Sequence, residues 1–159
     1  MKNLSVSRLV KLGIVAAIYV ALTLALSSLS YGNIQFRIAE ALMLLCFYKK
    51  DYGISLIVGC LIANIFSPMF LWDMTFGTLA TILAVICMIY SPNIYIASIF
   101  PVIFNGIIVG LELHFLYDLP FVLSAIEVAV GEFVCVCIVG IIIFKLLEKN
   151  KKFMKMLTE

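Results

Sequence analysis

Six carboxyl side chains lie within or beside long apolar stretches of this sequence: Glu40, Asp73, Glu112, Asp118, Glu127 and Glu132. An ionisable side chain at membrane depth costs from about 2.5 kcal/mol upward, so one that persists there usually faces a polar cavity or a partner. Carboxylates accept paired hydrogen bonds from arrays of N–H groups, such as a guanidinium or the amide and amino edge of a guanine-like base. These residues therefore predict the binding of a cationic ligand or of a ligand rich in hydrogen-bond donors.

Four charged residues form two pairs that are close in the sequence. Arg37 and Glu40 are three residues apart, so they share one helix face and are expected to form an ion pair. That pair either serves only the structure or also contacts a ligand. Glu127 and Glu132 are five residues apart on neighbouring faces of one helix, and Glu132 is the deeper of the two. Because loops cannot solvate Glu132, a ligand, a pore or a donor from another helix must do so.

Two amides and one indole extend the set of candidate binding residues. Asn64 and Asn105 lie inside apolar stretches, where an amide either joins helices by hydrogen bonds or contacts the edge of a ligand. Trp72 lies in the same half of the predicted bundle. Its ring suits stacking on a flat heterocycle, and it also fits the aromatic belt that forms at membrane interfaces.

The sequence lacks the motifs of several common enzymes. It contains no GxxxxGK[ST] phosphate loop, no HExxH and no GxSxG, so ATP hydrolysis and the familiar peptidase or esterase chemistry are not predicted. The five cysteines have no CxxC pair and no histidine at ligand spacing, which predicts small apolar side chains without a disulfide, a metal or another cofactor. An intramembrane enzyme with Glu127 and Glu132 as an acid/base pair remains an alternative, although it lacks a nucleophile.

Membrane helices must position these residues. Of 159 residues, 65% are hydrophobic and only 13% are charged, against roughly 25% charged in soluble proteins. A spanning helix needs about 20 apolar residues. We therefore predict one all-α domain covering residues 1–159, a polytopic bundle of six transmembrane helices with no nucleic-acid partner. The predicted spans are residues 9–29, 36–48, 53–66, 74–90, 94–113 and 121–147.

Basic residues predict the orientation. Of the 11 lysines and arginines, all except Arg37 fall on one side of the six-span arrangement, in the N-terminal segment, the turn at Lys49 and Lys50, and the C-terminal segment from Lys145 onward. Cytoplasmic loops are enriched in lysine and arginine. Both termini are thus expected in the cytoplasm, and the six carboxyl groups in the outer half of a plasma-membrane protein.

The first predicted helix carries small residues at every fourth position: Gly13, Ala17, Ala21 and Ala25. Small residues at this spacing let another helix approach closely. The stripe predicts a docking face, and the spacing leaves open whether the second helix belongs to this chain or to another protein.

Five segments carry a resemblance to a known family. They are QFRIAEAL at residues 35–42, GCLIAN at 59–64, DMTFGTLAT at 73–81, FNGIIVG at 104–110 and VGE at 130–132. Together they resemble the QueT family of queuosine-precursor transporters, over nearly the whole chain. These transporters are substrate-binding S components of energy-coupling factor (ECF) transporters.

The resemblance implies a six-helix S component that captures a 7-deazaguanine, such as 7-aminomethyl-7-deazaguanine, a related precursor or queuine, at its outer face. It also implies docking onto a transmembrane coupling subunit with two cytoplasmic ATPases, whose ATP cycle drives toppling of the S component. In that superfamily an AxxxA pattern on the first helix contacts the coupling subunit, and Ala17 and Ala21 supply it here.

The resemblance also suggests roles for individual residues. Glu132 or Glu127 is assigned to the amide and amino edge of the base, and Asn105 and Asn64 are assigned to its remaining polar atoms. Glu112 or Asp73 would bind an exocyclic ammonium.

Arg37 with Glu40 is expected to shape a gate at the loop between the first two helices. An S component for another vitamin-like heterocycle is the nearest alternative function. A purely structural assembly protein would leave the six acids unexplained.

Overall fold

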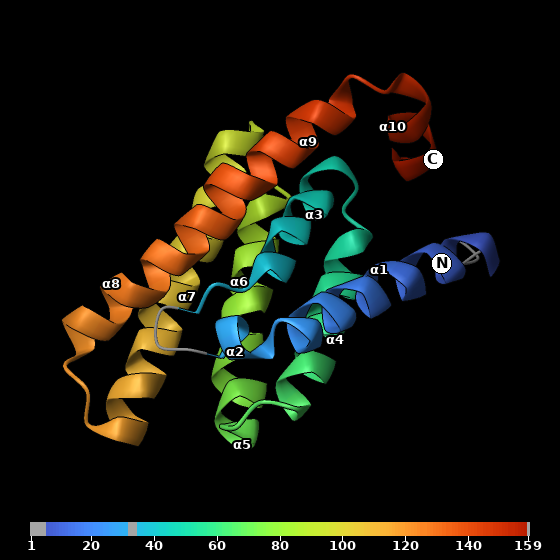
Figure 1. Ribbon diagram of the computed structural model, residues 1–159. Coiled ribbons are helices and arrows are strands. Elements are labelled where there is room, and N and C mark those ends of the chain that lie inside the picture. The colour runs from blue at the N-terminus through green and yellow to red at the C-terminus, as the bar shows by residue number, and fades with distance from the viewer. Residues whose placement is uncertain (1–5, 32–34, 159) are drawn as a thin grey trace.

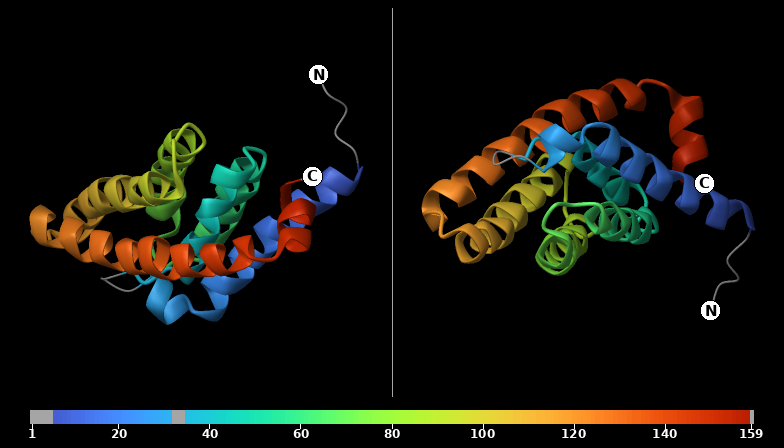
Figure 2. Two further views of the ribbon diagram at one scale, coloured as in Figure 1. Left: turned by 90° about the horizontal axis from the view of Figure 1, so that it is seen from above. Right: turned by 60° about the horizontal axis from the view of Figure 1, so that its bottom comes forward.

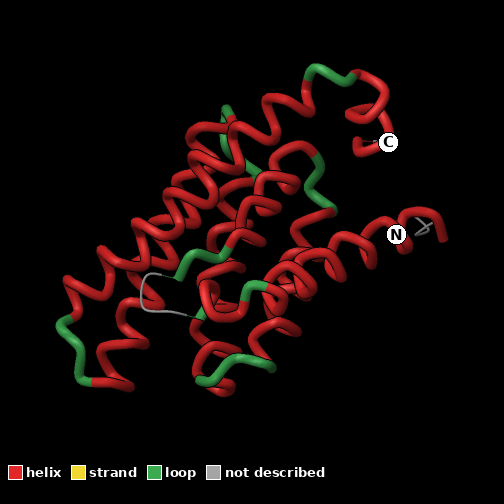
Figure 3. The backbone as a smooth tube through the Cα atoms, in the orientation of Figure 1, coloured by secondary structure: helices red, strands yellow, loops and turns green. Residues whose placement is uncertain are grey.

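The computed structural model describes residues 6–31 and 35–158, and in these residues it contains helices and no strands (Figures 1 and 3). Four helical segments are long and apolar enough to cross a membrane: Val6–Ala25, Phe70–Met88, Ile94–Tyr117 and Phe121–Glu148. Two shorter apolar segments are Ile38–Tyr48 and Tyr52–Ile65.

Each of the six predicted spans matches one of these segments, but the count of six transmembrane helices is not confirmed. At about 2 Å per residue for the 3₁₀ part and 1.5 Å for the α-helical parts, the two shorter segments each reach only about 20 Å, whereas the hydrocarbon core is about 30 Å thick.

The first half of the chain forms short and long helices in turn. Their bounds are Val6–Ala25 for α1, Ser27–Ser30 for α2, Ile38–Leu44 for the 3₁₀ helix η1, Leu45–Tyr48 for α3 and Tyr52–Ile65 for α4. The first helix ends at Ala25 rather than at residue 29, because the chain turns at Leu26. Lys2, Glu159 and residues 32–34 of the predicted first turn lie outside the described residues.

The second half contains three long helical segments and a short terminal helix. The bounds are Phe70–Trp72 for α5, Asp73–Gly77 for the π-helix η2, Thr78–Met88 for α6, Ile94–Tyr117 for α7, Phe121–Glu132 for α8, Phe133–Gly140 for the π-helix η3, Ile141–Glu148 for α9 and Lys151–Thr158 for α10. The fourth span thus begins at Phe70 rather than 74, and the fifth continues to Tyr117 rather than 113.

Local sequence explains where α7 begins and ends. The Asn93 side chain accepts a hydrogen bond from the Ile96 N–H at 2.9 Å, which caps the first turn. At the other end Asp118 adopts a left-handed conformation with φ 53°, and Pro120 directly precedes α8. An aspartate tolerates this conformation better than most residues. The chain therefore reverses within three residues, and α8 returns beside α7.

Two close crossings hold the bundle together (Figures 1 and 2). On α7, Gly106 and Gly110 face Ala125 and Ala129 of α8, and a Cβ atom built at Gly110 would lie 2.8 Å from the Ala125 Cα. Helix α1 crosses the rest of the bundle obliquely and packs on α4, where a Cβ atom at Gly59 would lie 3.1 Å from the Cβ of Tyr19. Side chains on these four helices can therefore reach a common interior.

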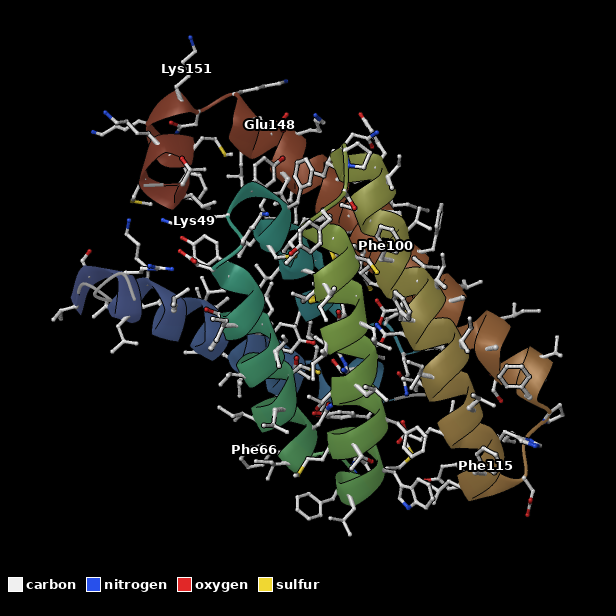
Figure 4. All side chains as sticks on the ribbon, turned by 180° about the vertical axis from the view of Figure 1, so that it is seen from behind. Lys49, Phe66, Phe100, Phe115, Glu148 and Lys151 are labelled. Atoms are coloured by element: carbon white, nitrogen blue, oxygen red, sulfur yellow. The ribbon has the colours of Figure 1, made fainter. Side chains whose placement is uncertain are left out.

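The two ends of the bundle differ in chemistry. Figure 4 shows Lys49, Glu148 and Lys151 at one end, called the basic end below, and Phe66 and Phe115 at the opposite end, called the Phe115 end. At the basic end Arg8 pairs with Asp51. There Glu148 accepts hydrogen bonds from the Lys145 ammonium at 2.9 Å and the Tyr48 hydroxyl at 2.8 Å. These two acids are thus neutralised locally.

Candidate functional site

A buried guanidinium lies at the centre of the candidate site. Arg37 ends a short non-helical segment that leads into η1, and its Nη1 atom lies 3.7 Å from Oε1 of Glu40, in the first turn of η1. The Tyr19 hydroxyl, from α1, donates a hydrogen bond to the same oxygen. The predicted ion pair between Arg37 and Glu40 is therefore present. A residue of the first helix holds its acidic member.

Helices α4 and α6 contribute a polar patch around Cys60. Its sulfur accepts hydrogen bonds from the Thr81 hydroxyl at 3.1 Å, the Asn64 amide at 3.4 Å and the Arg37 guanidinium at 3.8 Å. Cys60 is a free thiol, as expected. It is nevertheless part of a hydrogen-bonded network rather than an isolated apolar side chain.

The π-helical turn η2 places Asp73 beside Asn64. The Asn64 amide donates to the Asp73 carbonyl oxygen at 2.8 Å, and the Ser67 hydroxyl donates to Oδ2 of the Asp73 carboxyl group. Gly77 closes this turn, and a Cβ atom there would lie 3.0 Å from the Asn64 amide nitrogen and 3.6 Å from Oδ1 of Asp73. The glycine keeps space open beside both polar groups.

Two more carboxyl groups reach this region from α7 and α8. Glu112 lies within electrostatic range of Asp73 and Arg37. Glu132 lies within range of Glu40, Arg37 and the Asn105 amide. Both glutamates are buried, with 0% and 2% of their surface exposed. Carboxyl groups from η1, η2, α7 and α8 thus surround one arginine, in the central cluster of side chains that we call the carboxyl cluster: Arg37, Glu40, Asn64, Asp73, Asn105, Glu112 and Glu132.

Many polar atoms of the carboxyl cluster have no hydrogen-bond partner in the part of the chain that the structure describes. They are Nε of Arg37, Oε2 of Glu40, Oδ1 of Asn64, Oδ1 of Asp73, Nδ2 of Asn105, both carboxyl oxygens of Glu112 and Oε2 of Glu132. Buried polar atoms are normally satisfied, because leaving one unpaired costs about 1–3 kcal/mol. This concentration of acceptors at one place suits a ligand that brings several N–H donors.

The described side chains include no group of three or more histidines, cysteines or acids arranged to hold a metal ion.

A cavity of about 280 Å³ adjoins the cluster on the side of the Phe115 end. It is lined by Tyr31, Gln35, Pro68, Met69, Leu113, Tyr117 and Leu119. Leu113 directly follows Glu112, Gln35 lies two residues before Arg37, and the Tyr31 ring lies 5.7 Å from the guanidinium carbon of Arg37 in a cation–π contact. A second hollow of about 420 Å³ shares Pro68, Met69 and Tyr117 with it. None of the seven cluster residues lines either hollow.

Two of the predicted binding residues differ from the rest. Glu127 is only partly buried on α8, one and a half turns from Glu132. Trp72 is 39% exposed, stacks on Phe76 at 5.6 Å and lines the second hollow rather than the cluster. Of the two glutamates on α8, only Glu132 is buried with the carboxyl cluster.

The small residues predicted to form a docking face lie on the outside of the bundle. Gly13, Ala17, Ala21 and Ala25 are all exposed, and an added Cβ atom at Gly13 would meet nothing within 4 Å. The buried residues of α1 are Tyr19 and Thr23, on the opposite face. The helix thus presents a smooth surface outward while its other face contacts the interior.

Sequence reasoning missed Tyr19, Cys60, Thr81 and Ser67. Each is a single polar or polarisable residue inside an apolar stretch, a pattern that normally indicates ordinary helix packing. The available signal for Tyr19 was its place opposite the small-residue stripe, which directs its hydroxyl inward.

Comparison with known proteins decides the family. A family model described as QueT transporter matches residues 9–149. The chain belongs to the QueT family. A QueT relative from Lactococcus lactis subsp. cremoris (strain MG1363), named Queuosine precursor transporter QueT, is 36% identical over 163 residues, which cover 92% of this chain and 95% of the relative. No solved structure matches the chain.

Membership of the QueT family supports a transporter role. The segments that carried the resemblance include Arg37, Glu40, Asn64, Asp73, Asn105 and Glu132 of the carboxyl cluster. In this QueT-family chain, the matched segments therefore supply most of the cluster.

Proposed function

We propose that this chain is the substrate-binding S component of an ECF transporter and imports a 7-deazaguanine precursor of queuosine. The name of its Lactococcus relative supports this class of substrate. The observation that carries the proposal is the carboxyl cluster, in which four carboxyl groups and two amides come from five helical segments and one guanidinium comes from the segment just before η1.

The proposed contacts follow the geometry of the cluster. Glu132 accepts from the amide and amino edge of the base, and Asn105 beside it contacts a further polar atom of the ring. Glu112 and Asp73 lie within range of each other and receive the exocyclic ammonium of 7-aminomethyl-7-deazaguanine. Asn64 is held by Asp73 and completes this side of the site.

The proposed partners are a transmembrane coupling subunit and two cytoplasmic ATPases, which supply the energy of ATP hydrolysis. The exposed stripe of α1 is the proposed contact with the coupling subunit. Helices η1–α3 and α4 complete a six-helix bundle with both termini in the cytoplasm. The Phe115 end then faces outward, and substrate enters through the cavity beside Tyr31.

Isothermal titration of the purified chain with 7-aminomethyl-7-deazaguanine tests the proposal. We expect saturable binding, and we expect Glu132→Gln to weaken it at least tenfold. The substitution replaces one acceptor oxygen with an NH₂ donor, which would face the N–H donors of the ligand. Glu127→Gln is the matched control and should leave the affinity within about twofold. Equal effects of the two substitutions would remove Glu132 from the site.

A panel of heterocycles separates this function from the nearest alternative. Thiamine, riboflavin and biotin should show no saturable binding under the same conditions. Tight binding of one of them together with none of the deazaguanines would assign the chain to a different vitamin-like substrate.

A further inference from the structure

An apolar groove lies toward the basic end, and no residue of the carboxyl cluster lines it. It has a volume of about 200 Å³ and runs between α1, η1, α3, α9 and α10. Its lining is hydrocarbon or aromatic throughout: Val15, Ile18, Ala41, Leu42, Leu45, Ile143, Phe144, Leu147, Phe153 and Leu157. A hydrocarbon chain matches this lining, because it has no polar group that would be left without a partner.

Helix α10 closes one end of this groove. Figure 1 shows it between the end of α9 and the start of α1. The Tyr52 hydroxyl donates to the Leu157 carbonyl oxygen and the Lys11 ammonium to the Met156 carbonyl oxygen, both at 2.9 Å. Leu157 is buried, whereas Lys151 and Lys152 are exposed. The helix therefore holds an apolar face against the bundle and a cationic face outward.

A second hollow adjoins the groove at α10. It has a volume of about 390 Å³ and is lined by Asn150, Lys152, Phe153 and Met156. Phe153 lines both spaces, so the groove and the hollow meet at one side chain, and the exposed Lys152 also lines the hollow. This arrangement matches a molecule that has a hydrocarbon tail and an anionic head.

We propose that this site binds one anionic phospholipid, with an acyl chain in the groove and the phosphate at Lys152 and Asn150. The position supports this occupant, because apolar helices line the groove and the hollow lies at the basic end of the bundle. Lysines near the membrane surface attract anionic lipids. The site is separate from the carboxyl cluster and does not depend on the proposed substrate.

Native mass spectrometry of the chain in neutral detergent tests the proposal, with phosphatidylglycerol and phosphatidylcholine of the same acyl chains as probes. We expect phosphatidylglycerol to bind in a ratio of one to one and more tightly than phosphatidylcholine. Lys152→Gln should lower the affinity for phosphatidylglycerol about fivefold, which corresponds to roughly 1 kcal/mol per basic residue. Lys151→Gln is the matched control, since it removes the same charge from a residue that does not line the hollow. It should lower the affinity for phosphatidylglycerol by less than about twofold.

A second variant tests the groove. Ile18 lines it and is 45% exposed, so Ile18→Trp should fill it without disturbing the core. This variant should lose the bound lipid while its melting temperature stays unchanged. Three results would overturn the proposal: equal losses in the two lysine variants, equal affinity for both lipids, or full binding by Ile18→Trp.

Discussion

Helix α1 has two faces, one that contacts the carboxyl cluster through the Tyr19 hydroxyl and one that carries the proposed docking stripe. The hydrogen bond of this hydroxyl holds Oε1 of Glu40, which also faces Arg37, so the position of this carboxyl group depends on a residue of α1. On the opposite face of the same helix lie Ala17 and Ala21, in the proposed docking stripe. A movement of α1 would therefore change the contacts of Glu40 directly.

Tyr19→Phe should weaken ligand binding about tenfold, because a hydrogen bond to a charged group contributes about 1.5–3 kcal/mol. Titration calorimetry measures this change. Thr23→Val is the matched control. Thr23 is also buried on α1, but its hydroxyl bonds back to the Tyr19 carbonyl oxygen at 2.9 Å. If the control loses as much affinity as Tyr19→Phe, the effect belongs to helix packing and not to Glu40.

At the scale of elements, the crossing of α7 and α8 sets the distance between two carboxyl groups of the site. Glu112 follows Gly110 on α7, and Glu132 lies on α8 two turns beyond Ala125. The glycines bring the two backbones so close that a methyl group at Gly110 would lie 2.9 Å from the Cβ of Ala125. The geometry of the site therefore depends on Gly106 and Gly110, although neither has a side chain that could contact a ligand.

Gly110→Ala should lower stability by about 1–3 kcal/mol, since the clash is with backbone and Cβ atoms that cannot rotate away. The expected readout is a lower melting temperature in detergent together with weaker ligand binding. Gly13→Ala is the control, because its space is open and alanine favours the helix by about 1 kcal/mol. Equal melting temperatures for the two variants would contradict the close crossing.

The exposed stripe of α1 allows a separate test of docking. If the proposed coupling subunit docks here, Ala17→Leu should abolish co-purification with it, since a larger side chain prevents close helix approach. Ligand binding should remain, because Ala17 faces away from the carboxyl cluster. Ala17→Ser keeps the size of the residue and should retain the complex. A stable complex with Ala17→Leu would exclude this face as the docking surface.

The sequence predicted those features that depend on composition and spacing. Apolar runs located all six helical segments, and three-residue spacing predicted the contact between Arg37 and Glu40. The hydrogen bonds of Cys60 and Tyr19 depend on which helices lie side by side. The spacing of residues along one helix does not predict that arrangement. The sequence predicted Glu132 to be the deeper of the two glutamates of α8, and the structure buries Glu132 and leaves Glu127 only partly buried.

At the scale of the whole molecule, charge is divided between two ends. Arg8 and Lys145 pair with the acids of the basic end. In the carboxyl cluster, four carboxyl groups face the single guanidinium of Arg37. A cationic or donor-rich substrate is thus attracted to the cavity at the Phe115 end, while the basic end favours the side of the membrane with anionic lipids.

This division predicts the orientation of the chain in a cell. A cysteine introduced at Asp118, in the exposed turn between α7 and α8, should react with a membrane-impermeant maleimide in intact cells. A cysteine introduced at Lys151, in the exposed start of α10, should react only after the membrane is permeabilised. The native cysteines lie in apolar helices and are buried or partly buried, so the unmodified chain serves as the background control. Labelling of Lys151→Cys in intact cells would show that the orientation is the opposite one. The cavity beside Tyr31 would then open to the cytoplasm, where it could not capture an external substrate.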